Sequence, residues 1–577
     1  MACQRAISLS MRRSLGVPVF LIAAVCCSKT DVKSNGSGPP ATPQAAPKPT
    51  FTLFALAEVR GQIGPCGCTS DPLGDLSRTA RMVTDARAAG PTLVVDAGSL
   101  LYSKSPVPAQ FDAQEELKAD LLATTYTTEL AVAALGLGPA DLVKGPSKTR
   151  LPRSIANLGS STDIKLAAPM IIDAPALTGG AKVGVFGVAV PAMVAGVTVD
   201  APERAGKEAV ALLKQQGAQV IVGLIQAPSK KDAVKLMRDI GGIDLAIAGL
   251  GALAPEPERI EIEPQKVGDG WIVVPANRGQ IISRVEITLR GQGPLVDAIG
   301  PAAATTKLAS LNKRLAGLDE DLQKLAADPE ADPTFVKTTQ EDRAQTAAQR
   351  DELEKRPLIV PASGSYFTLA QVKINKTLAC AKSVDDRVTE YFRAAGEANV
   401  KAVTSKPPAP ARGQPGYAGT AACEDCHADA VTFWKTTRHA HAWKTLVDRG
   451  QQFDFDCTSC HVTGWERPGG SNLVFNEPLR DVQCEVCHGP SSNHVVTGGE
   501  EKPAATLRAP VQELCANQCH TKEHSDTFEY TAYLRDILGP GHGEAARKKL
   551  GDGPTGAQLR KAALDKAGRT LGAGCSR

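Results

Sequence analysis

Three short stretches decide what the C-terminal part of the chain can form: CEDCH at residues 423–427, CTSCH at 457–461 and CEVCH at 484–488. Each has the spacing C-x-x-C-H. Two cysteines at this spacing can form thioethers with the two vinyl groups of one haem, and the adjacent histidine is then placed to bind the iron. Zinc binding is the alternative interpretation, because paired cysteines also hold zinc. A histidine directly after each of three pairs favours c-type haem.

A fourth stretch, CANQCH at residues 515–520, has three residues between its cysteines. It predicts a fourth, non-standard haem site if the loop bulges outward. The alternatives are a disulfide between the two cysteines, or a single thioether that leaves three complete sites. The predicted attachment residues are Cys423, Cys426 and His427 (site 1); Cys457, Cys460 and His461 (site 2); Cys484, Cys487 and His488 (site 3); and Cys515, Cys519 and His520 (site 4).

All nine histidines lie at or after His427, and five of them stand outside the motifs. Each of the five is a candidate second axial ligand. Two axial histidines close an iron and suit it to electron transfer, whereas an open iron binds small nitrogen or oxygen species. Five candidates for four irons favour electron transfer, with a haem redox enzyme that has one open iron as the alternative. The candidates are His439, His441, His494, His524 and His542.

The segments TAACEDCHADAVTFWKTTRHAHAW, CTSCHVTGW, VQCEVCHGPSSNHV and CANQCHTKEHSDTFEYTAYLRDILGPGHG resemble the tetrahaem cytochrome c-554 family of multihaem cytochromes. The resemblance covers about residues 417–543 and implies four covalently bound haem c groups, the fourth at a non-standard motif. It implies that His439, His494 and His542 are distal ligands, with His441 and His524 as further candidates. It also implies partner proteins that donate and accept electrons.

From residue 51 to about residue 301, short apolar runs alternate with helical patterns, which predicts an α/β domain with a largely buried sheet. The expected strands are 52–59, 92–98, 182–190, 219–226, 244–250 and 271–276, and the expected helices include 77–89, 114–135 and 203–216.

LGDLSRTARM, LVVDAGS and DLAIAGLGA in this domain resemble the 5′-nucleotidase branch of the calcineurin-like metallophosphoesterases. Those enzymes need a two-metal centre of Asp, Asn and several His. Glu58-Val59-Arg60 stands where the family has Asp-x-His, and Gly249-Leu250-Gly251-Ala252 stands where it has Gly-His-x-His. The Asp-Ala-Gly-Asp segment ends in Ser99. We therefore expect the fold without phosphoesterase chemistry, and a hydrolase is the disfavoured alternative.

The N-terminus has the pattern of a bacterial lipoprotein signal. Arg12 and Arg13 precede an apolar run at 15–25 that is too short to span a bilayer, and Cys26 and Cys27 follow it as candidate lipidation sites. Plain export or an uncleaved anchor is the alternative. We expect an exported, lipid-anchored protein on the periplasmic side or at the outer membrane of a Gram-negative bacterium. The net charge of +3 argues against a nucleic-acid partner.

The predicted fold class is multidomain: an α/β metallophosphoesterase-like sandwich, then a helical hairpin, then a mainly α and irregular multihaem cytochrome c domain. Leucines spaced by three and four from Leu308 to Leu325 predict the hairpin, either a spacer or a dimerising coiled coil. The segments are a lipoprotein-type signal peptide (1–27), a Pro/Ala/Ser-rich tether (28–50), the α/β domain (51–301), the hairpin (302–356), a small β/α extension (357–404), a Pro-rich linker (405–416), the multihaem domain (417–550) and a C-terminal tail (551–577).

After the signal segment, four further cysteines follow none of these patterns. Cys66 and Cys68 lie after the first expected strand, and they suit a thiol site, a metal site or a disulfide with Cys380. Cys575, near the C-terminus, is expected to be free.

Overall fold

The computed structural model describes residues 50–65, 69–159, 163–251, 263–291, 293–299, 301–328, 332–355, 360–503, 511–542 and 544–576, all within one compact unit. The signal, most of the tether, Cys26, Cys27, Cys66 and Cys68 lie outside the described residues, so they stay predictions. In the described part of the chain, no helix combines the length and the apolar character that crossing a membrane requires.

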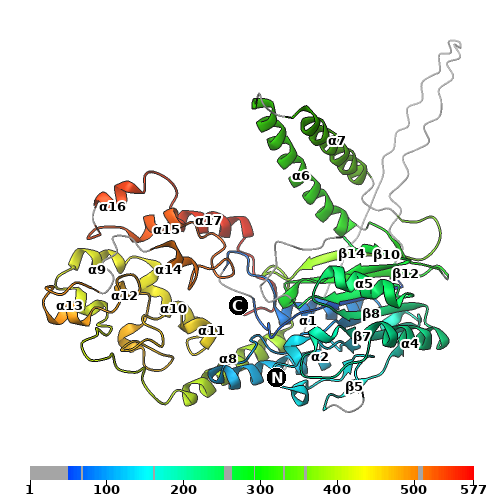
Figure 1. Ribbon diagram of the computed structural model, residues 1–577, viewed down its shortest axis with the longest axis horizontal. Helices are drawn as coiled ribbons and strands as arrows, with labels where there is room; N and C mark the ends of the chain where they lie inside the picture. The colour runs from blue at the N-terminus through cyan, green and yellow to red at the C-terminus, as the bar shows by residue number, and fades with distance from the viewer. Residues whose placement is uncertain are drawn as a thin grey trace, which may run out of the picture. The chain divides into compact units, whose positions relative to one another are not determined.

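Two six-stranded sheets form the centre of the α/β region (Figure 1). The first has the order β13-β14-β12-β1-β2-β3 and the second the order β10-β11-β9-β8-β7-β6. The first sheet consists of β1 (Phe51–Leu56), β2 (Thr92–Asp96), β3 (Ala134–Leu135), β12 (Ile281–Thr288), β13 (Val296–Asp297) and β14 (Tyr366–Lys373). The second consists of β6 (Met170–Ile172), β7 (Val183–Ala189), β8 (Val220–Gln226), β9 (Leu245–Gly249), β10 (Gln265–Val267) and β11 (Gly270–Val273).

The sheets pack face to face, because Leu53 and Val95 of the first share one apolar core with Val222 and Ile247 of the second. Helices α1 (Leu76–Ala89), α2 (Asp112–Thr127) and α8 (Lys382–Ala402) cover the outer face of the first sheet. Helices α4 (Pro202–Gln215) and α5 (Lys230–Ile240) cover that of the second. The predicted α/β sandwich is confirmed.

Two details differ from the sequence expectation. Helix α2 ends at Thr127, and the end of the run expected as helix, 114–135, forms β3 beside β2. Threonines close that helix, and their branched side chains have weak helix propensity. Also, the segment expected as a separate extension after the hairpin joins the sandwich: β14 pairs with β12, and α8 packs on α1 and α2.

The helical hairpin consists of α6 (Pro301–Ala327) and α7 (Pro333–Lys355), which pack along each other (Figure 1). Leu311 and Leu315 of the predicted leucine seam are buried. Arg314 and Asp342 form an ion pair of 2.8 Å across the two helices.

The C-terminal region is built of short helices joined by irregular segments. None of the hydrophobic core clusters in the described residues includes a residue after Ala395. The buried apolar side chains of this region, such as Leu473 and Leu534, lie outside those clusters. Its α-helices are α9 (Ala428–Trp434), α10 (Ala442–Val447), α11 (Phe455–Thr458), α12 (Cys484–His488), α13 (Ser492–Val496), α14 (Gln512–Ala516), α15 (Tyr530–Ile537), α16 (Glu544–Lys549) and α17 (Gly556–Ala567).

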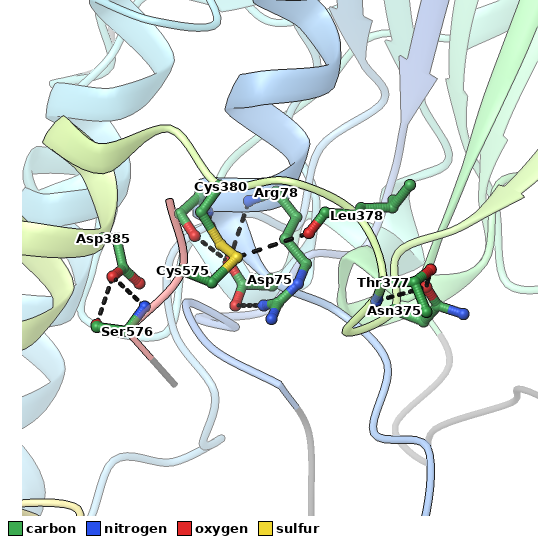
Figure 2. Close-up of a disulfide and its surroundings, with 10 residues drawn as sticks. Asp75, Arg78, Asn375, Thr377, Leu378, Cys380, Asp385, Cys575 and Ser576 are labelled. Carbon is green, nitrogen blue, oxygen red and sulfur yellow. Dashed lines mark hydrogen bonds and ion pairs between the residues drawn. A yellow bond between two sulfur atoms is a disulfide. The ribbon is translucent and has the colours of Figure 1, made fainter. Parts of the chain in front are cut away.

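Figure 2 shows that the end of the chain returns to the α/β region through a disulfide between Cys380 and Cys575. The expectation of a free Cys575 is therefore wrong, and so is a disulfide from Cys66 or Cys68 to Cys380. Cys380 N–H donates to the Ala573 carbonyl at 2.8 Å. A Cβ atom at Gly572 would lie 1.8 Å from the Leu378 carbonyl oxygen, so glycine is what lets the tail approach this closely.

Candidate functional site

The turn of site 4 accommodates its extra residue and keeps the hydrogen bond between the histidine and the first cysteine. In site 1 the His427 N–H donates to the Cys423 carbonyl at 2.9 Å, and in site 4 the His520 N–H donates to the Cys515 carbonyl at 2.8 Å. The histidine amide thus meets the carbonyl of the first cysteine in both motifs, although the loop of site 4 is one residue longer. Cys515 and Cys519 form no disulfide with each other.

The four motifs lie next to one another in a definite order. The Cys484 thiol of site 3 forms a hydrogen bond with the Cys423 thiol of site 1, and this bond lowers the pKa of Cys484 to about 6. Sites 1 and 3 are therefore neighbours. The Cys460 thiol of site 2 forms a hydrogen bond with Cys519 of site 4, and this bond lowers the pKa of Cys460 to about 7. Sites 2 and 4 are therefore neighbours. Burial and, second, the charge of Cys515 raise the pKa of Cys487 to about 11, which joins site 3 to site 4. The spatial order is 1–3–4–2.

Two motif histidines face a histidine from outside the motifs at the separation that an iron requires. The ring centres of His427 and His494 are 6.3 Å apart, and those of His520 and His439 are 6.2 Å apart. Imidazole nitrogens bind a metal at about 2 Å, so two rings on opposite sides of one iron have centres roughly 6 Å apart. These two pairs fit bis-histidine coordination.

The other two motif histidines also have a histidine neighbour. Burial lowers the pKa of His542, and the charge of His488 lowers it further. The pKa of His461 is lowered by burial and, more weakly, by the charges of Arg449 and His524. The predicted distal ligands His439, His494 and His542 therefore lie near sites 4, 1 and 3, and His524 lies near site 2.

Burial also favours the chemical form of these side chains that binds a metal. It lowers the pKa of His439, and it is the main cause that lowers the pKa of His520 to about 4. Neutral imidazole is the ligand form, because a protonated ring has no free lone pair.

Hydrogen bonds at Nδ1 orient several of these rings. His461 Nδ1 meets the Ala442 carbonyl at 2.5 Å, and His494 Nδ1 meets the Glu501 carbonyl at 2.6 Å. A carbonyl only accepts, so Nδ1 carries the proton in both rings and Nε2 is the nitrogen left to bind a metal. The donor set, the spacing and the tautomers all fit haem iron.

His441 differs from His439 and His494. It lies two residues after His439 in η7 (Arg438–His441), and its charge acts on Asp481, whose pKa burial raises. Among the described residues, no ring contact joins His441 to a motif histidine.

A cavity of about 2200 Å³ runs between the motifs and the α/β region. His439, His461, His520 and His524 line it from one side, and Arg60 and Arg278 line it from the other. Residues of sites 2 and 4 and residues of the α/β region therefore share one space.

In the α/β region, ionic and hydrogen-bonded pairs occupy the positions where the resemblance implies metal ligands in phosphoesterases. Glu58 is buried and accepts from Arg60 Nε and from Gln226 Nε2, both at 3.0 Å. Asp96 is buried and accepts from the Tyr126 hydroxyl at 2.6 Å. In the described ranges, no group of three or more His, Cys, Asp or Glu side chains is arranged to hold a metal ion.

The sequence analysis missed the α/β residues that hold the C-terminal region. Gln114 donates to Asp454, Ser70 donates to Asp526, and Arg278 forms an ion pair with Glu523. These partners are 245 to 456 residues apart, and no local motif marks either side of the contacts.

Part of this region matches a known protein family. The family described as cytochrome c554 and c-prime matches residues 422–489, which hold sites 1 to 3. Cytochrome c-554 of Nitrosomonas europaea is 33% identical over 93 residues, a match of 13% of this chain and 40% of that protein. The chain thus spans less than half the length of this relative.

The solved structures that resemble the chain include a 5′-nucleotidase precursor from Thermus thermophilus, with 16% identity, a TM-score of 0.40 and coverage of 62% of this chain and 60% of that one. They also include the sulfate thiohydrolase SoxB of Thermus thermophilus, with 13% identity, a TM-score of 0.41 and coverage of 63% and 64%. The chain covers less than two thirds of each. At residues 422–489 the chain is similar to the cytochrome c554 family, which implies covalently bound haem c in this region.

Proposed function

We propose that the C-terminal region binds four haem c groups covalently and passes electrons along them. The observation that carries this proposal is that two of the motif histidines, His427 and His520, face a histidine from outside the motifs with ring centres 6.3 and 6.2 Å apart. The motif cysteines would form the thioethers, and the motif histidines would be the proximal ligands. His494, His524, His542 and His439 would be the distal ligands of sites 1, 2, 3 and 4.

Bound haem iron would supply one-electron chemistry, and the protein would supply spacing and closure. The order 1–3–4–2 brings each site next to the following one, because the cysteines of neighbouring motifs touch or influence one another. An imidazole on each side of an iron would exclude small ligands. This arrangement favours electron transfer over a reaction at iron.

The test is the intact mass of the exported protein together with its reduced-minus-oxidised spectrum and its EPR spectrum. Four covalent haems with only low-spin signals are expected. A mass that accounts for three haems would remove site 4 from the proposal. A high-spin signal that shifts with nitric oxide would support the enzyme with an open iron instead.

We propose from the sequence alone that the protein is exported and anchored by a lipid on Cys26 or Cys27, on the periplasmic side or at the outer membrane. Redox partner proteins would then reach it outside the cytoplasm. Labelled palmitate in the mature protein, lost when both cysteines are exchanged for serine, would test the anchor.

For the α/β region we propose a structural role without phosphoesterase activity. The Glu58–Arg60 ion pair supports this, because a guanidinium neutralises the carboxylate at a position where the resemblance implies a metal ligand. Purified protein should not hydrolyse nucleotides with added Mn²⁺, and metal-dependent hydrolysis would contradict this role.

A further inference from the structure

The imidazole of His520 in site 4 meets a side-chain hydroxyl at its Nδ1 atom. Ser525 is only 7% exposed, and its hydroxyl oxygen lies 3.1 Å from His520 Nδ1. The Nδ1 partners of His461 and His494 are main-chain carbonyls, which no substitution removes. The Nδ1 contact of site 4 can therefore be altered by a single exchange.

The Ser525 hydroxyl belongs to a chain of three hydroxyl groups. It lies 3.3 Å from the Tyr533 hydroxyl, which in turn lies 2.7 Å from Thr527 Oγ1. With Nε2 of His520 as the iron ligand, Nδ1 carries the proton and donates to Ser525. Ser525 then donates to Tyr533, and Tyr533 donates to Thr527. Each hydroxyl accepts from one neighbour and donates to the next.

Aromatic rings hold the same imidazole. The ring of Phe528 is nearly parallel to that of His520, with centres 4.9 Å apart and an angle of 11°. The ring of Tyr533 meets His520 edge-on, with centres 5.1 Å apart and an angle of 78°. The imidazole would have to displace one of these rings to turn away from Ser525.

The C-terminal tail packs on Tyr533. Arg535 of α15 donates to the carbonyls of Leu550 and Pro554, at 2.8 and 2.9 Å. Gly556, the first residue of α17, is buried, and a Cβ atom there would lie 2.4 Å from Tyr533 Cδ2. Glycine is thus what lets the tail approach the tyrosine ring so closely. The tail lies outside the residues that match the cytochrome family, yet it forms part of the surroundings of site 4.

We propose that Ser525 and Tyr533 set the reduction potential of site 4 through the hydrogen bond to His520, and that the tail fixes Tyr533 for this role. This inference rests on the proposed attachment of haem at site 4. An acceptor at Nδ1 makes an imidazole a stronger electron donor to its metal. Ferric iron carries one more positive charge than ferrous iron and gains more from such a donor, so the contact lowers the potential. Ser525 and Tyr533 are positioning residues, because they act on the iron through His520.

The test is a redox titration of the full-length, haem-loaded protein, followed by EPR. Ser525→Ala removes the acceptor at Nδ1. At a fixed potential it should raise the ferrous-to-ferric ratio of one low-spin centre about tenfold, which is about 59 mV for a one-electron centre. The other centres should move much less. Ser525→Thr retains the hydroxyl and should restore the potential of the wild type.

Two variants act on the chain from its other end. Tyr533→Phe keeps the ring and removes the hydroxyl. Its shift should have the same sign as that of Ser525→Ala and be smaller, because hydrogen bonds in a chain strengthen one another. Gly556→Val should displace Tyr533 and shift the same centre. Both variants give the readout should Ser525→Ala fail to accumulate.

His439→Ala identifies the centre that should move. It removes the ring that faces His520, so the low-spin signal that it abolishes belongs to site 4. Ser525→Ala must shift that signal. The matched control is Ser365→Ala, because Ser365 is 2% exposed and its hydroxyl donates to the Gly291 carbonyl in the sandwich. It should leave every potential unchanged.

An unshifted potential in Ser525→Ala, a shift at a different centre, or an equal shift in Ser365→Ala would overturn the proposal. Intact mass separates this inference from the proposed function. A wild type without haem on Cys515 and Cys519 would overturn both. Four haems with unshifted potentials in Ser525→Ala would overturn only the role of the hydroxyl chain.

Discussion

Gln114 and Asp454 are 340 residues apart in the sequence, and the Gln114 amide donates a 2.8 Å hydrogen bond to the Asp454 carboxylate. Asp454 is also the N-cap of α11, where it accepts from the Asp456 N–H at 2.8 Å. One buried carboxylate therefore joins the sandwich to the turn that carries Cys457. The sandwich and the C-terminal region are thus linked by a buried polar contact, in which Gln114 and Asp454 each need the other as hydrogen-bond partner.

Exchange of Gln114 for leucine tests this link. We expect Gln114→Leu to lower the free energy of unfolding by about 1–3 kcal/mol, because the buried Asp454 carboxylate and the more exposed Asp456 carboxylate both lose a donor. Gln114→Glu should lower it more, since a third carboxylate would face Asp454 and Asp456. Denaturant unfolding of the full-length protein measures both. Gln215→Leu, at the exposed end of α4, should stay within about 0.5 kcal/mol of the wild type. Equal effects of leucine and glutamate would contradict this account.

The disulfide fixes the end of the chain. Its cysteines are 195 residues apart, so the bridge closes a loop that contains all four cysteine–histidine motifs. Removing it in Cys380→Ala/Cys575→Ala should lower stability by about 2–5 kcal/mol, measured by thermal unfolding. Non-reducing peptide mapping of the wild type should recover the two cysteine peptides as one species. Reaction of Cys575 with maleimide before reduction would contradict the bridge.

His439 and His441 form a matched pair on one turn. His439→Ala should turn one low-spin centre into a high-spin one, because the ring that faces His520 is removed. His441→Ala should leave all centres low-spin. The haem mass should be the same in both variants, since the thioethers are untouched. EPR of the oxidised proteins makes the comparison, and a high-spin signal from His441→Ala instead would reverse the assignment.

Much of this arrangement could be predicted because it is local. C-x-x-C-H motifs carry their chemistry within five residues, and buried parallel strands such as 183–189 and 220–226 are continuous apolar runs. Surplus histidines could be recognised as candidate ligands by their number and by resemblance. Their assignment to sites needed the structure, because it depends on which segments meet in space.

The contacts that join the parts could not be predicted in this way. Ser70 and Asp526 are ordinary loop residues, and each gains its role only from a partner 456 positions away. The same holds for Cys575, whose partner is fixed by the path of the tail beside Leu378 (Figure 2). The end of α2 at Thr127 was misplaced for a related reason, since pairing of 134–135 with β2 overrides a helical pattern.

Asp96 gives a prediction for the pH dependence of stability. Its full burial raises its pKa from 3.8 to about 7, although hydrogen bonds from Tyr126 and Gly98 oppose the shift. Between these two values the unfolded chain has lost the proton and the folded chain retains it. The unfolded state therefore binds fewer protons, and stability falls as the pH rises, by about 1.4 kcal/mol per pH unit. Above pH 7 the loss is complete.

Asp96→Asn removes this dependence, because the amide stays uncharged; its oxygen can accept from the Gly98 N–H, and its NH2 group can donate to the Tyr126 hydroxyl oxygen. We expect the free energy of unfolding of the variant, minus that of the wild type, to rise between pH 4 and pH 7 and to level off above. Urea unfolding at each pH measures it. Asp239→Asn provides a contrast, because Lys235 donates a hydrogen bond to this exposed carboxylate and lowers its pKa. The small difference in the free energy of unfolding between this variant and the wild type should therefore have the opposite sign. A difference for Asp96→Asn that stays flat across this range would show that Asp96 is ionised in the folded protein.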